Sequence, residues 1–256
     1  MTASTTLVPS VGGPFTRTEA VELGRIEYQR FIEALTALHP DDWGRPTDCE
    51  GWTVRDLAGH LAGSMETARG LRHLLGEQRA IKKRRKETGE AEIDAMAAVQ
   101  VAKVADLAPA ELIERMRALV QPAIAGRLRI PEIIGRHLRF PVEIGSLNER
   151  WDVLYLHGTI LTRDTWLHRV SDLARAVQRS PTLDEAHDGR IVADVAGEWA
   201  RRHGQPVDLQ LTGPAGGQFT TGANGPTIEL DAIEFCRILS GRAQATHELL
   251  ATEVPF

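Results

Sequence analysis

Residues 148–177 follow helical spacing and place two polar side chains beside an apolar stripe. Asp164 and His168 are four residues apart, so on a helix they project from one face, one turn from each other. A carboxylate or an imidazole beside a buried stripe needs a partner, because burying either one alone costs several kcal/mol. This segment therefore predicts a long packed helix with a polar site on one side. Its apolar stripe comprises Leu154, Ile160, Leu161 and Leu167.

The N-terminal two-thirds of the chain is predicted to be helical. Before the run described above, apolar residues recur at helical spacing in the segments 17–39, 53–75, 91–104 and 110–119. Thr53 is a good N-cap for the second of these helices, and Asp56 completes a weak capping box. Residues 129–147 break the pattern with Pro and Gly, and we expect an irregular loop there that walls a pocket.

The last quarter has the pattern of an α+β domain. A helix is expected to end at Gly204, and the alternation from Val207 to Leu211 predicts a strand. Two further strands and a helix capped by Asp231 follow. The expected organisation is a flexible tail (1–15), a helical domain (16–179), a linker (180–190) and an α+β domain (191–256).

Composition excludes several classes of function. The formal net charge is −5, so no basic excess favours nucleic acid. We interpret the short basic cluster 82–86 as a solvated helix face or loop, and a nuclear or nucleic-acid signal is the alternative. Cys49 and Cys236 are far apart and are expected to be reduced thiols. Neither a signal peptide nor a membrane span is recognisable, which favours a cytoplasmic protein that binds no membrane.

A metal ion is one partner that would satisfy Asp164 and His168. One helix supplies two ligands well, and His60, in the apolar helix LAGHLAG, is the best third candidate. Two imidazoles and a carboxylate leave an open position on the ion, as catalytic sites do. The alternative is a core histidine bonded to a backbone carbonyl, with an exposed Asp164 paired with Arg163 or Arg169. His157 lies two turns before Asp164 and is a fourth ligand, a base for a thiol proton, or a core histidine.

Five motifs, in this order, resemble the mycothiol-dependent maleylpyruvate isomerase family. They are GWTVRDLAGHLAG, RDTWLHRVSDLARA, HDGRIVADVAGEWARRHG, LTGPAGGQFTTG and ELDAIEFCRILSGRA with its C-terminal ELLATEVPF. The resemblance extends from about Thr16 to Phe256. It implies an N-terminal DinB-like four-helix bundle that binds a metal, and a smaller C-terminal α+β domain similar to sterol-carrier folds.

The resemblance also implies site residues and cosubstrates. The metal ligands are His60, Asp164 and His168, with zinc as the expected ion. Many members have Glu where this chain has Asp164, which is one methylene shorter. Mycothiol, the thiol of an actinobacterial cell, is the implied cosubstrate, and Arg237 falls where members place an arginine toward the substrate carboxylates. The alternative for Arg237 is a surface helix arginine.

Three functions are consistent with these residues. The first is an enzyme in which a metal-bound thiolate adds to a maleylpyruvate-like unsaturated acid and isomerises its cis double bond. The second is a mycothiol S-transferase that conjugates a biosynthetic or xenobiotic electrophile. The third is a non-enzymatic metal-binding module. A small electrophile and mycothiol are the expected partners, and the chain is expected to be a monomer or homodimer.

Overall fold

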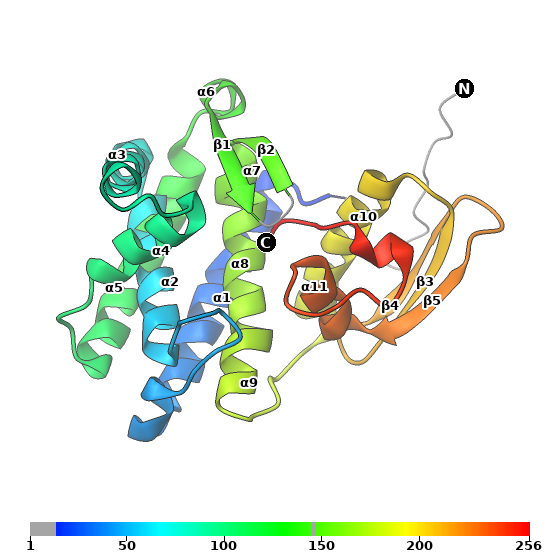
Figure 1. Cartoon of the computed structure of the whole chain (residues 1–256), viewed down its shortest axis with the longest axis horizontal. Helices are drawn as coiled ribbons and strands as arrows, with labels where there is room; N and C mark the ends of the chain where they lie inside the picture. Colours follow the sequence, from blue (N-terminus) through cyan, green and yellow to red (C-terminus); the bar gives the residue numbers. More distant parts are fainter. Residues whose placement is uncertain (1–13, 145–146) are drawn as a thin grey trace. The chain divides into compact units, whose positions relative to one another are not determined.

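The computed structural model describes residues 14–144 and 147–256, and the chain divides into two compact units (Figure 1). We call residues 17–180 the helical unit, and residues 181–256 with the segment before residue 17 the C-terminal unit. The predicted flexible tail lies outside the described residues except at its last two positions. There, the backbone N–H of Phe15 donates a hydrogen bond to Asp194 Oδ1 at 2.9 Å within the C-terminal unit.

Helices account for most of the helical unit. Its first elements are α1 (Arg17–Thr36), the 3₁₀-helix η1 (Pro40–Gly44), α2 (Val54–Ala68), α3 (Leu71–Thr88), α4 (Glu92–Ala102) and α5 (Pro109–Arg129). Thr53 caps α2 in a capping box with Asp56, as predicted. In the described part of the chain, no helix is both long enough and apolar enough to cross a membrane.

The last helix of this unit contains two stretches with wider, π-type turns. In order it consists of α7 (Val153–Tyr155), η2 (Leu156–Ile160), α8 (Leu161–Leu167), η3 (His168–Leu173) and α9 (Ala174–Ala176). Stretches of π-helix are rare and are found frequently at functional sites. Here the second stretch begins at His168.

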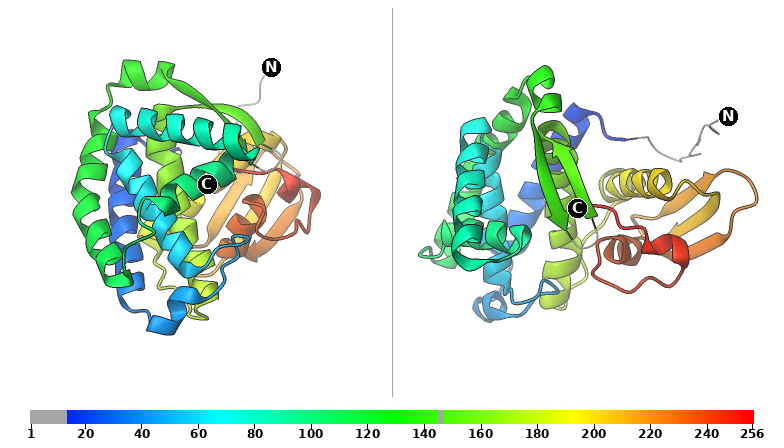
Figure 2. Two further views of the ribbon diagram at one scale, coloured as in Figure 1. Left: turned by 60° about the vertical axis from the view of Figure 1, so that its left-hand side comes forward. Right: turned by 45° about the horizontal axis from the view of Figure 1, so that its top comes forward.

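The core of the helical unit lies between α1, α2, α5 and this last helix. Helix α2 packs against α4 and α5, α5 packs against α1, and α1 packs against α8; Figure 2 shows the same neighbours from two further directions. The largest fully buried side chains of this core include Tyr28, Phe31, Leu35, Leu57, Leu61, Met65 and Leu112.

The expectation of an irregular loop over residues 129–147 is wrong for 129–144 and 147, while 145–146 lie outside the described residues. The segment contains α6 (Glu132–His137) and enters an antiparallel hairpin of β1 (Arg139–Ile144) and β2 (Leu147–Asp152). The last helix consequently starts at Val153, five residues after the predicted start. Pro141 obscured the strand signal, yet a two-stranded sheet consists only of edge strands, where proline is tolerated.

The C-terminal unit is an α+β arrangement. It contains the π-helical turn η4 (Glu185–Gly189), α10 (Arg190–His203), β3 (Val207–Thr212), β4 (Gly217–Thr221), β5 (Thr227–Asp231), α11 (Ala232–Leu239) and the 3₁₀-helix η5 (Glu248–Ala251). The strand order is β4-β3-β5, with β3 antiparallel to β4 and parallel to β5. The predicted stop at Gly204 and cap at Asp231 are both confirmed.

The basic cluster 82–86 belongs to the last two turns of α3. Arg84 pairs with Glu90 at 2.7 Å, and Arg85 pairs with Glu92 at 2.6 Å. Of the two expected placements, helix face or loop, the structure shows a helix face whose charges are partly paired with acidic neighbours.

Candidate metal centre

His60 is held inside the helical unit by the close approach of α2 to its neighbours. The residue is 5% exposed. One turn further along α2, Gly63 lies against Gln100 of α4 so closely that an added Cβ would be 2.5 Å from the Cβ of Gln100. The small residues of LAGHLAG therefore permit close helix packing, as expected, and His60 becomes a buried side chain.

The last helix brings Asp164 and His168 to the same place. His60 Nε2 is 3.4 Å from Asp164 Oδ2, and His168 Nε2 is 3.2 Å from Asp164 Oδ1. One donor atom from each of the three residues lies within 4.8 Å of the other two. The structure therefore groups the three residues that the sequence singled out as metal ligands.

The alternative arrangement of Asp164 is not found. Its side chain is only 19% exposed and contacts the two imidazoles. Arg169 instead forms a buried two-pronged pair with Glu27 of α1, with N···O distances of 2.7 and 2.9 Å. This pair ties η3 to α1 at the residue directly after His168.

The donor set fits a divalent ion. Both ring nitrogens of His60 are buried and have no hydrogen-bond partner among the described residues. A buried imidazole without such a bond is costly, and coordination of an ion would satisfy it. Two nitrogens and one carboxylate oxygen are also the ligand types of catalytic zinc sites.

The charges of Asp164 and His168 shift the pKa of each other. Burial alone raises the pKa of Asp164, but the charges of the nearby His168 and His60 outweigh it and hold that pKa below its usual range. Burial lowers the pKa of His168, but the charge of Asp164 and the hydrogen bonds to Asp164, Asp172 and Cys49 raise it well above its usual value.

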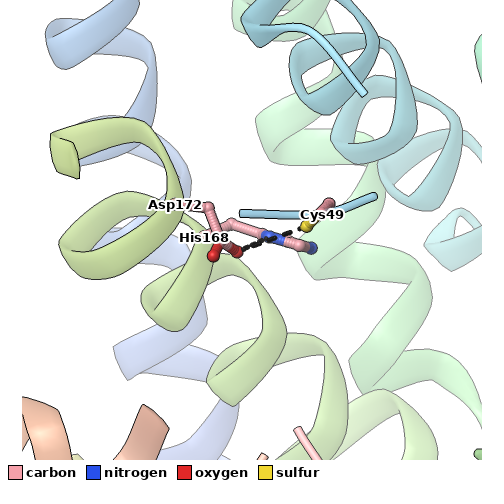
Figure 3. Close-up of side chains that lie close together, drawn as sticks. All are labelled: Cys49, His168 and Asp172. Atoms are coloured by element: carbon pink, nitrogen blue, oxygen red, sulfur yellow. Dashed lines mark hydrogen bonds and ion pairs between the residues drawn. The ribbon is translucent and has the colours of Figure 1, made fainter. Parts of the chain in front are cut away.

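A second carboxylate lies behind His168 (Figure 3). His168 Nδ1 is 2.6 Å from Asp172 Oδ2, and Asp172 is completely buried. The thiol of Cys49 donates to the same oxygen at 3.6 Å. Cys49, His168 and Asp172 also have donor atoms within 4.8 Å of one another, so they form a second possible set that shares His168.

Asp172 was missed in the sequence although a signal was present. It follows His168 by four residues, the same spacing that drew attention to Asp164. Carboxylates that bind the second nitrogen of a metal-ligating histidine fix its ring and its tautomer. Cys49 comes from the loop before α2, and no sequence spacing relates it to His168.

Aromatic rings border the group. The ring of Trp52 has its centroid 5.1 Å from that of His60 and 6.3 Å from that of His168, and the two imidazoles are 5.2 Å apart. Trp52 therefore contacts both candidate ligands directly. Trp166 is fully buried and packs the interior.

The two residues expected to be catalytic belong to different units of the chain. His157, on η2, is 2% exposed and does not join the groups of close ligand atoms found among the described residues. Burial lowers its pKa to about 3, and the charges of Arg127 and Arg17 act in the same direction, so the ring is neutral at pH 7. Arg237 belongs to α11 of the C-terminal unit, where its Nε is 3.2 Å from Glu234 Oε2.

Comparisons with known proteins place this geometry in context. A sequence model described as the mycothiol maleylpyruvate isomerase N-terminal domain matches residues 25–174, more than half of the chain. The crystal structure of a mycothiol-dependent maleylpyruvate isomerase is similar, with a TM-score of 0.53 and 16% identity over 94% of this chain and 95% of that one. The crystal structure of a mutant of that isomerase is also similar, with a TM-score of 0.53 and 15% sequence identity over 90% of each chain. At such identity, the structural likeness shows the fold alone. A comparison with curated proteins found no match.

Proposed function

This chain belongs to the mycothiol maleylpyruvate isomerase family, a family of enzymes, and on that premise we propose that it is a metal-dependent enzyme with mycothiol as cosubstrate. The observation that supports this most is the buried group of His60, Asp164 and His168, in which His60 has no hydrogen-bond partner among the described residues. A reduced low-molecular-weight thiol is a cytoplasmic reagent, so we propose the cytoplasm as the place of action.

We extend the proposal to the architecture. The helical unit, with α1, α2, α5 and the last helix around one core, is assigned to the DinB-like four-helix bundles. The C-terminal unit is assigned to the sterol-carrier-like α+β domains. We keep the expected domain boundaries as part of the proposal, with residues 180–190, which include η4, as the linker. The basis is the sequence resemblance described above.

We assign the metal ligands to His60, Asp164 and His168, and zinc as the ion. When bound, a divalent ion lowers the pKa of a coordinated thiol so far that the sulfur is a thiolate. The residues of the chain hold the ligands in place: Asp172 fixes the His168 ring through Nδ1 and leaves Nε2 for the site.

The reaction proposed for the thiol is addition and elimination. The sulfur of mycothiol forms a bond to one carbon of the cis double bond. The π electron pair of that double bond moves onto the conjugated carbonyl. The former double bond is now a single carbon–carbon bond and can rotate. Loss of the same sulfur then restores the double bond in the trans acid and returns the thiol. Arg237, whose fork of donors suits a carboxylate, is proposed to hold the substrate.

The S-transferase is the alternative within the same family, because a thiolate that adds without elimination leaves a thioether. The test is to incubate the metal-loaded chain with mycothiol and maleylpyruvate and to follow the vinyl protons by NMR. Cis-to-trans conversion that requires mycothiol is the result we expect. A stable thioether would favour the transferase. Metal binding without any turnover of thiol or electrophile would overturn both and leave a metal-binding module.

A further inference from the structure

One cavity of the helical unit contains none of the candidate metal-centre residues. Its volume is about 350 Å³, and it lies where the junction of α2 and α3 meets the C-terminal end of α5. The residues that line it are Arg69, Gly70, Leu71, Arg72, His73, Gly126, Arg129, Ile130 and Pro131. We call it the α2–α3 cavity.

Two glycines shape this cavity. Gly126 of α5 packs against the end of α2 so closely that an added Cβ would be 2.2 Å from the carbonyl oxygen of Ala68. Gly70 separates α2 from α3 with φ of +146°, a conformation that side chains rarely adopt, and a Cβ there would meet no atom within 4 Å. The open space beside Gly70 is therefore part of the cavity.

The charged residues among those that line the cavity are all basic. Three of its residues are arginines, and no acidic residue lines it. Arg69 pairs with Glu66 at 2.8 Å, but Glu66 is shared with Arg115. Arg72 and Arg129 have no ion pair in the part of the chain that the structure describes, and both are exposed enough to reorient toward a ligand.

The pKa of His73 is lowered in part by the positive charges of the neighbouring arginines. Burial lowers the pKa of His73, and the charges of Arg69 and Arg72 lower it further, more than Glu66 raises it. An anion in the cavity would offset these charges and stabilise the protonated imidazole.

We propose that the α2–α3 cavity binds a small organic anion, an oxyanion joined to a short apolar group. Arg72 and Arg129 supply charge-assisted hydrogen bonds to the oxyanion. The planar fork of N–H donors on a guanidinium matches the spacing of two oxyanion oxygens. Leu71, Ile130 and Pro131 supply the apolar wall. The site goes beyond the proposed function, because it uses neither the thiol nor the metal ligands.

The test is isothermal titration calorimetry on the full chain with four probes: phenyl phosphate, benzoate, inorganic phosphate and phenol. The affinity for phenyl phosphate compared with that for benzoate shows whether the site prefers a phosphate or a carboxylate. We expect both to bind more tightly than inorganic phosphate, and phenol not to bind. The double substitution Arg72→Gln with Arg129→Gln is expected to weaken binding by about tenfold or more, since each change removes a charged hydrogen bond.

The matched control is Arg136→Gln, an exposed arginine of α6 outside the cavity that pairs with Glu132. It is expected to leave affinity within about twofold. An NMR titration of His73 provides a second readout, in which the bound anion raises the pKa of the imidazole. The proposal is overturned if neither organic anion binds, if phenol binds as tightly as they do, or if the double variant and Arg136→Gln bind equally well.

Discussion

The Nδ1 atom of His168 lies 2.6 Å from the Oδ2 atom of Asp172, and the carboxylate is completely buried. This buried contact places the carboxylate where it can orient the ring of His168. The opposite nitrogen of the ring faces Asp164 at 3.2 Å. The two carboxylates, one on each side of a single imidazole, fix which nitrogen is offered to an ion.

Asp172→Asn is the substitution that tests this orientation. The amide keeps the size of the side chain but removes its charge, so we expect metal affinity to fall by about 10- to 100-fold. Competition with a fluorescent chelator measures the change. Cys49→Ser is the matched control, because the hydroxyl can keep the contact to Asp172, and its affinity should stay within about threefold of wild type. Equal affinity in Asp172→Asn and wild type would contradict an orienting role.

His157 predicts a specific loss of stability in acid. Burial and the charges of Arg127 and Arg17 lower its pKa to about 3 in the folded chain, against an ordinary value of 6.5 for a histidine surrounded by water. The unfolded chain therefore binds a proton below about pH 6.5 that the folded chain does not bind. Above about pH 6.5 neither state binds this proton, and His157 does not change the free energy of unfolding. From about pH 6 down to pH 4, the free energy of unfolding falls by roughly 1.4 kcal/mol per pH unit.

The measurement is the urea midpoint of wild type and His157→Gln at pH 7.5, 6 and 5. Other groups titrate in both proteins, so the difference between the two curves isolates His157. The variant should lose less stability than wild type on acidification. Parallel curves would show that His157 is not kept neutral by its surroundings.

The close contact between Gly63 and Gln100 predicts that a side chain at position 63 would push α2 away from α4. The added Cβ of Gly63→Ala would lie 2.5 Å from the Cβ of Gln100, so we expect a loss of about 1–3 kcal/mol. Gly76→Ala, in the interior of α3, is the control: nothing lies within 4 Å of the added atom, and stability should rise by up to about 1 kcal/mol. Denaturant unfolding of both variants decides, and equal effects would contradict the close packing of α2 on α4.

Arg237→Gln tests the proposed carboxylate contact. We expect KM for maleylpyruvate to rise by about tenfold or more, and the rate with an electrophile that has no carboxylate to stay near that of wild type. Glu234→Gln removes one ion-pair partner of Arg237 but keeps the guanidinium, so its KM should change little. If both variants raise KM equally, the effect of Arg237 is on the structure of α11.

Local patterns predicted local structure well. The caps at Thr53 and Asp231 depend on side-chain bonds to the next turn of the same helix, which spacing along the chain encodes. The hairpin of β1 and β2 was not predicted, because its strands depend on each other and Pro141 interrupts the first. Pairing between strands is decided by tertiary contacts that a single strand does not display.

The candidate site was predictable as far as helical spacing extends. Asp164 and His168 share a helix face, and His60 was selected by its apolar surroundings. Asp172 had the same spacing and could have been identified. The contact of Cys49 with Asp172 joins the loop before α2 to the last helix, and nothing in the sequence brings those segments together.

The most direct test of the metal centre is the metal content of the purified full chain, measured by elemental mass spectrometry on wild type, His60→Gln and His168→Gln. His73→Gln is the control, as a histidine outside the group, and circular dichroism checks that each variant is folded. The account predicts about one divalent ion per chain in wild type and His73→Gln, and loss of it in the other two. A wild type that takes up no ion on reconstitution, or variants that retain it at the wild-type level, would contradict the assignment of His60, Asp164 and His168.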